Sequence, residues 1–71
     1  MKQQIPENIS DALEERLVII EKHCKMGNMC SAGIITDAFY SQLNRYLDER
    51  YDLTEIRKKL DALVNKYNIN R

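Results

Sequence analysis

The sequence contains few of the residues on which several classes of protein depend. In 71 residues it has no tryptophan, one histidine, one proline, two glycines and two cysteines. Two cysteines are too few for a disulfide scaffold, and Gly27 and Gly33 do not form a phosphate-binding loop pattern. One histidine in so short a chain also leaves little material for a buried catalytic pocket. We therefore expect neither an autonomous enzyme nor a bound cofactor.

Long apolar runs and targeting segments are missing as well. The longest purely apolar run is Leu17–Ile20, whereas a helix that spans a bilayer needs about 20 such residues. The opening Met1–Pro6 carries one lysine and no apolar core after it, so we expect no secretory signal. These absences predict a cytoplasmic protein with no membrane attachment.

The chain has no net charge either, because eleven Lys and Arg balance eleven Asp and Glu. That balance lacks the basic excess expected of a general nucleic-acid binder. The charge is uneven, since residues 54–71 hold five basic and two acidic side chains. A helix-turn-helix around Gly27-Asn28 is conceivable, but its second helix offers only one arginine, Arg45, before the acidic pair Asp48-Glu49. Nucleic-acid binding is therefore kept as an alternative and is not favoured.

The residues that are present repeat at helical spacing. Apolar side chains at spacings of four, four, three and four predict a helix over 8–26, with Asn8 or Ser10 as its N-cap and Gly27-Asn28 as its stop. The predicted inward side chains of this helix are Ile9, Leu13, Leu17, Ile20 and Cys24.

Two further helices follow. The second is predicted over 31–50, with Ser31 as its N-cap and Thr36 as a rival start. Its predicted inward residues are Ile35, Phe39, Leu43 and Tyr46, with Ala38 at the edge. The third is predicted over 53–68, where Asp52 and Glu55 resemble a capping box. Its predicted seam is Leu53, Ile56, Leu60, Leu63 and Tyr67, with Val64 beside it.

No alternating apolar and polar stretch and no hairpin turn interrupts these helical patterns. We therefore predict an all-α protein in which residues 1–71 form a single helical domain. The short connection around Arg50–Asp52 makes a helical hairpin plus a third helix, a small three-helix bundle, the expected architecture. Because so short a bundle buries little apolar surface, we expect dimerisation to complete it.

Soft metal ligands crowd into one short segment. His23, Cys24, Met26, Met29 and Cys30 together would suit an ion such as Cu(I). Their spacing matches no zinc signature, and Cys24 belongs to a predicted core seam, where cysteine and methionine often fill the end of a bundle. No metal site is therefore predicted, and His23, Cys24 and Cys30 remain the candidates of a metal-binding or redox alternative, with Cys30 the more reactive thiol.

The chain has more apolar residues than these seams use. With the predicted stripe turned inward, Tyr40, Leu47 and Tyr51 fall together on a flank of the second helix. Val18 and Ile19 lie outside the seam of the first helix. These five residues either widen the core or form an interface, and we predict an interface because exposed apolar surfaces mark partners.

These features favour one function class over two others. We expect a small helical protein-interaction module, a regulator or inhibitor of the microbial or phage kind, by analogy of size and build. It would bind another protein, whose identity the sequence does not reveal, and associate as a homodimer. The alternatives are a DNA-binding or nucleoid-associated regulator and, third, a soft-metal or redox cysteine protein.

Overall fold

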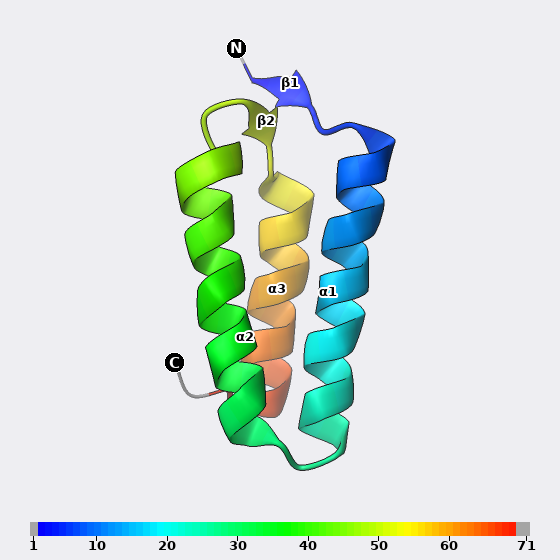
Figure 1. Ribbon diagram of the computed structural model, residues 1–71, viewed down its shortest axis with the longest axis vertical. Coiled ribbons are helices and arrows are strands. Elements are labelled where there is room, and N and C mark those ends of the chain that lie inside the picture. The colour runs from blue at the N-terminus through cyan, green and yellow to red at the C-terminus, as the bar shows by residue number, and fades with distance from the viewer. Residues whose placement is uncertain (1, 70–71) are drawn as a thin grey trace.

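In a computed structural model, which describes residues 2–69 apart from the side chain of Tyr46, the chain folds into upright helices that stand side by side (Figure 1). The described residues form three α-helices, α1 (Glu7–Lys25), α2 (Met29–Gln42) and α3 (Thr54–Tyr67). A π-helical turn, η1 (Leu43–Leu47), continues α2. The prediction of a small all-helical fold is confirmed, and no described helix is long and apolar enough to cross a membrane.

The turn between α1 and α2 follows from Gly27. Its φ of 81° lies in the left-handed region, which glycine enters without a Cβ clash. The N–H of Gly27 donates to the Cys24 carbonyl (3.1 Å) and that of Asn28 to the His23 carbonyl (2.9 Å), the two bonds of a Schellman motif. The predicted helix stop at Gly27-Asn28 is therefore confirmed.

The starts of α1 and α2 differ from the predicted starts. α2 begins at Met29, two residues before Ser31, because the Asn28 carbonyl already accepts the Ala32 N–H at 3.0 Å. Thr36 is therefore not a start but an interior residue. α1 begins at Glu7 after Pro6, with no side-chain cap, so Ser10 does not cap it. Proline is well suited to this position, since its fixed φ is compatible with a helix start.

Two short strands were not predicted. β1 (Gln3–Gln4) pairs in parallel with β2 (Tyr51–Asp52), and the Gln3 N–H donates to the Arg50 carbonyl at 3.0 Å. Strands of two residues are too short for an alternating pattern to show. The pair ties the N-terminal segment to the connection before α3, at the top of Figure 1.

The core confirms the predicted seams of α1 and α3 in their central residues. The buried apolar residues are Leu13, Leu17, Ile20, Cys24, Ala32, Phe39, Leu43, Leu53, Ile56, Leu60 and Ile69. Ile9, Leu63, Val64 and Tyr67 are partly buried against them.

The predicted inward stripe of the second helix is confirmed for Phe39 and Leu43, which are fully buried, and Ile35 is half-buried against the core. The structure adds Ala32, Gly33 and Thr36 to the buried side of α2, while Ala38, predicted at the edge, is exposed. Tyr46, also assigned to that stripe, has a side chain outside the described part of the structure.

Side-chain hydrogen bonds lie at the start of α3, and a residue in the left-handed conformation ends it. The Asp52 carboxylate accepts hydrogen bonds from the Thr54 N–H at 3.0 Å and from the Thr54 hydroxyl at 2.6 Å. Asp52 thus binds the first residue of α3 from one position before the N-cap, Leu53, and the predicted pairing of Asp52 with Glu55 is not what the start of the helix uses. At the other end Asn68 has a φ of 54°, and the Ile69 N–H donates to the Val64 carbonyl at 3.0 Å. The chain changes direction at Asn68, which places the Ile69 side chain in the core.

Candidate interaction surface

Large apolar side chains remain exposed on α1, at its C-terminal end and on α2. Ile34 is 66% exposed, Val18 65%, Met26 64% and Ile19 42%. Among the described residues of α3, no large apolar side chain is exposed in this way. The exposed apolar surface therefore lies on the hairpin that α1 and α2 form.

One side of this hairpin is marked by a hydrogen bond between the two helices. The Arg16 guanidinium on α1 donates to the Gln42 side-chain oxygen on α2. Along each helix, residues three, four or seven positions from Arg16 or Gln42 continue this side, apart from those that turn into the core. We call this surface the α1–α2 face and define it by Ala12, Arg16, Ile19, Ile35, Ala38 and Gln42.

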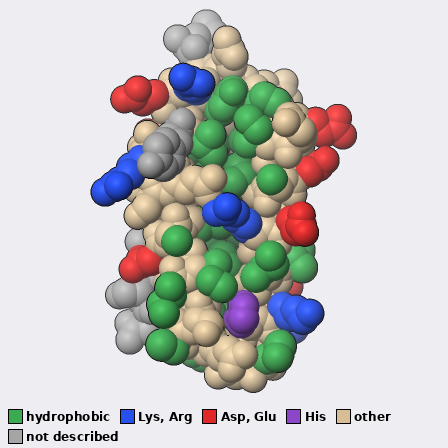
Figure 2. Space-filling view, viewed as in Figure 1, with side chains coloured by type: hydrophobic (Ala, Val, Ile, Leu, Met, Phe, Trp, Pro, Cys, Tyr) green, Lys and Arg blue, Asp and Glu red, His purple; other side chains and the backbone are tan. Residues whose placement is uncertain are grey.

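The α1–α2 face is poor in charge. Arg16 is the one charged residue among the six that define it, and Gln42 already accepts its hydrogen bond. Figure 2 shows this side of the molecule, with apolar side chains along its length, a basic side chain near its middle, and acidic and basic side chains at its edges. Protein interfaces combine apolar side chains with polar ones, and arginine is enriched among them.

The five predicted interface residues do not form one patch. Tyr40, Leu47 and Tyr51 are partly buried against the core, and the Tyr40 hydroxyl donates to Asp61 on α3. Ile19 belongs to the α1–α2 face. On α2, Tyr40 thus lies toward α3, while Ile34 faces solvent.

Val18, the fifth residue, lies elsewhere on α1. It lines a shallow groove with Lys22, Lys25 and Met26, which come from the same helix. The interface role of Val18, Ile19, Tyr40, Leu47 and Tyr51 stays a prediction. The structure adds Ile34 and Ala38 to the candidate interface residues, and neither was predicted from the sequence as one.

The sulfur and imidazole side chains are not arranged as a ligand set. Within residues 2–69, apart from the Tyr46 side chain, no group of three or more His, Cys, Asp or Glu is placed to hold a metal ion. Cys24 is buried and Cys30 is exposed, and both are free thiols. Burial, with a smaller effect of Glu21, raises the pKa of the Cys24 thiol, which keeps it protonated and unreactive. His23 is half-buried beside them.

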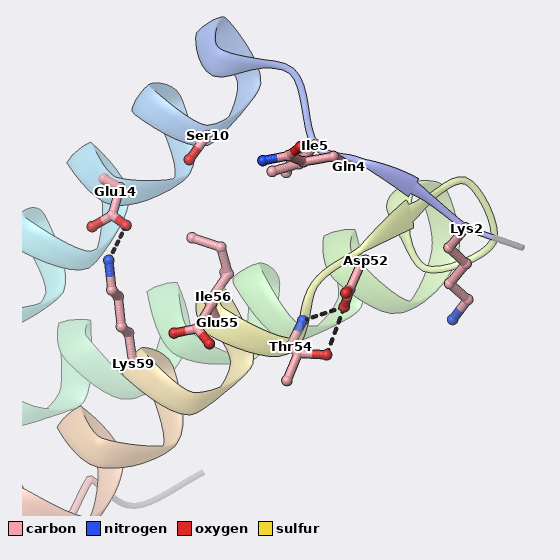
Figure 3. A pocket seen from close by; sticks show the side chains of 10 residues that line it. All are labelled: Lys2, Gln4, Ile5, Ser10, Glu14, Asp52, Thr54, Glu55, Ile56 and Lys59. Carbon is pink, nitrogen blue, oxygen red and sulfur yellow. Dashed lines mark hydrogen bonds and ion pairs between the residues drawn. The ribbon is translucent and has the colours of Figure 1, made fainter.

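A polar groove of about 660 Å³ lies between the N-terminal segment, α1 and α3 (Figure 3). Sequence reasoning missed it, because its lining comes from three separate segments. Lys59 of α3 forms an ion pair with Glu14 of α1, and Asp52 already accepts two bonds from Thr54. Ile5 and Ile56 supply its apolar part. Three of its ionic groups are thus used to hold the fold together.

Three basic side chains of α3, those of Arg57, Lys59 and Lys66, are also engaged within the chain. Arg57 donates to Asp48 at 3.0 Å and to Asn44 at 2.8 Å. Lys59 pairs with Glu14, and Lys66 lies 3.7 Å from a carboxylate oxygen of Glu21. The hydrogen bond from Arg57, followed by the charge of Lys2, holds the pKa of Asp48 below its ordinary value.

This pairing bears on the nucleic-acid alternative. A nucleic-acid binder gains affinity by placing unpaired cations on phosphates. Three of the basic residues of α3 are instead neutralised by carboxylates of α1 and of the residues between α2 and α3. This geometry does not favour the alternative.

Comparison of the chain with protein-family models, with curated proteins and with solved structures finds no match.

Proposed function

We propose that this protein is a small, non-enzymatic helical interaction module of the cytoplasm, a regulator or inhibitor that binds another protein and associates with itself. The observation that carries the proposal is the α1–α2 face. It presents Ile19 and Ala38 to solvent with Arg16 as its one charged residue, and it adjoins the exposed Ile34. Covering apolar side chains of this kind is favourable by about 25 cal/mol per Å² of buried apolar area.

The remaining features support this function. Arg57, Lys59 and Lys66 of α3 pair with carboxylates of other parts of the same chain, which supports a fixed position of α3 against the hairpin. A surface that is ordered before binding loses less entropy when it binds. Two free thiols suit a reducing compartment.

Capture from a lysate of the source organism tests the proposal with matched variants. Ala38 and Ala62 are both exposed helical alanines, one on the α1–α2 face and the other on α3. We expect a protein that wild type and Ala62→Glu retain at physiological salt, and that Ala38→Glu loses, because the new carboxylate would be buried without a partner. If no protein is retained, or if Ala38→Glu retains the same proteins as Ala62→Glu, the proposal is wrong.

A further inference from the structure

We infer that the C-terminal half of α1 binds a short acidic segment of another protein, one that carries apolar side chains beside its carboxylates. The site is the shallow groove of about 260 Å³ that is lined by Val18, Glu21, Lys22, Lys25 and Met26, and we call it the α1 groove. It shares no residue with the α1–α2 face. An occupant of the α1 groove is therefore additional to any protein bound at that face.

The apolar side chains of the α1 groove lie mostly in solvent. Val18 is 65% exposed and Met26 64%, whereas the large apolar side chains described on α3 are buried or half-buried. Lys22 lies four positions from each of them, so the three side chains share one side of α1. From Val18 to Met26 the helix rises by about 12 Å, or roughly two turns. A partner gains binding free energy by covering exposed apolar side chains of this kind.

The charge at the groove is positive. Glu21 is the one acidic residue that lines it, and the Tyr67 hydroxyl donates to its carboxylate at 3.2 Å. The ammonium groups of Lys25 and Lys66 lie 4.0 and 3.7 Å from the oxygens of the same carboxylate. Lys22 forms no ion pair with a residue that the structure describes. Three ammonium groups thus stand against one carboxylate, which favours a partner that brings carboxylates of its own.

Acidic side chains of α1 limit how far such a partner extends. On the same side of the helix, Asp11 lies seven positions before Val18 and Glu15 three, and both acids are exposed. A nucleic acid or an anionic bilayer would be attracted at Lys22 and Lys25 but repelled at these two acids. A short segment that ends near Val18 avoids the repulsion. We therefore assign the groove to a short acidic segment of a protein.

The two lysines also have a role within the chain. Lysines near the C-terminal end of a helix offset the negative end of its dipole. That role accounts for Lys22 and Lys25, but it gives no reason for Val18 and Met26 to lie beside them in solvent. Apolar contacts with charges beside them are the means by which amphipathic segments are recognised. The assignment rests on this combination and not on the lysines alone.

Fluorescence anisotropy of two synthetic peptides with the purified full chain tests the inference. One peptide is short and amphipathic, with leucines on one side and glutamates on the other. The second peptide has lysine in place of every glutamate. We expect wild type to bind the acidic peptide at least about tenfold more tightly than the basic one, and more weakly as the salt concentration rises. Equal affinities, a preference for the basic peptide or binding of neither would overturn the inference.

Matched variants locate the binding. Lys22 and Lys58 are both exposed helical lysines without an ion pair among the described residues. Lys22→Glu should weaken binding of the acidic peptide at least about fivefold, and Lys58→Glu, which changes the net charge equally, less than about twofold. Val18→Ala should also weaken it, whereas Ile34→Ala, at a side chain of nearly the same exposure (66% against 65%), should not. If the members of either pair behave alike, the peptide binds elsewhere and the inference is wrong.

Two further measurements separate the α1 groove from other sites. Vesicles of anionic phospholipid should not retain the protein, and vesicles that retain wild type but not Lys22→Glu would assign the groove to a bilayer and overturn the inference. Ala38→Glu, on the α1–α2 face, should bind the acidic peptide as wild type does, and a loss of binding would place the peptide on that face instead. The lysate capture above therefore fails or succeeds independently of the peptide measurements. Circular dichroism should show equal helicity for all variants.

Discussion

α2 and α3 have the same length, fourteen residues, but their residues are distributed differently. α3 holds six charged side chains and α2 holds one. In α3 the charged side separates clearly from the seam of Ile56 and Leu60, and the charges pair with other elements. In α2 apolar residues occupy both the core side and the solvent side. The comparison indicates that the positions of charged residues, more than the number of apolar ones, show which side of a helix faces solvent.

The largest effect expected from this comparison concerns one apolar residue of each helix. Leu60→Ala should lower the free energy of unfolding by about 2–5 kcal/mol, because Leu60 is fully buried and its removal leaves a cavity. Ile34→Ala should change it by less than about 0.5 kcal/mol, since that side chain is mostly in solvent.

Urea denaturation at low protein concentration measures both effects, because association then adds nothing to the stability. A cost for Ile34→Ala close to that for Leu60→Ala would show that Ile34 is core, and the distinction between the two helices would fail.

A smaller effect, of opposite sign, concerns the buried side of α2. Thr36 is fully buried, and its hydroxyl has no hydrogen-bond partner among the residues that the structure describes. An unsatisfied buried hydroxyl costs about 1–3 kcal/mol. Thr36→Val keeps the shape and removes that group, so it should raise the melting temperature and stabilise the protein by about 1 kcal/mol.

Thr54→Val is the matched control, because the Thr54 hydroxyl donates to Asp52 at 2.6 Å. Its loss should be mildly destabilising. If Thr36→Val also destabilises the protein, its hydroxyl has a partner, and the assignment of Thr36 to the inward side of α2 must be revised.

The sequence allowed much of the fold to be predicted wherever a local signal exists. Gly27 marked the first turn because only a left-handed residue closes a Schellman motif there. Leu17 and Leu60 were assigned correctly because each continues a seam of apolar residues at spacings of three and four. The strand pair was not predictable, since Gln3 and Tyr51 are brought together only by the tertiary fold.

The candidate site was harder to predict for a related reason. Its boundary depends on the hydrogen bond from Arg16 to Gln42, 26 positions apart, and no local pattern encodes that contact. Thr36 was considered only as a rival start of the second helix, and its full burial beside Phe39 has no local signal, because a threonine at helical spacing is as common on a solvent-facing side. Tyr40 was predicted as free apolar surface, but its hydroxyl reaches Asp61 on α3, while Ile34 was not selected and is 66% exposed.

The smallest expected effect is a difference between α2 and α3 in how they make the stability of the protein depend on pH. The hydrogen bond from the Thr54 hydroxyl, and then that from its N–H, lowers the pKa of Asp52, and Arg57 does the same for Asp48. Both carboxyl groups should have ordinary pKa values of about 3.9 in the unfolded chain. Because the folded values are lower, the stability that these groups add is present above about pH 4 and is lost as the pH falls through the folded values. Their exposure keeps the contribution small.

The corresponding experiment follows the midpoint of urea unfolding between neutral pH and strongly acidic pH. In Asp48→Asn with Asp52→Asn the acid-induced fall should be shallower than in wild type, because both titrating groups at the start of α3 are gone. Thr36→Val should shift the whole curve upward without changing its shape, since the change in α2 involves no titrating group. A double variant whose curve parallels that of wild type would mean that these carboxylates do not help to hold α3 against the hairpin. The contrast between α3, held by ion pairs, and α2, held by apolar packing, would then be wrong in its electrostatic part.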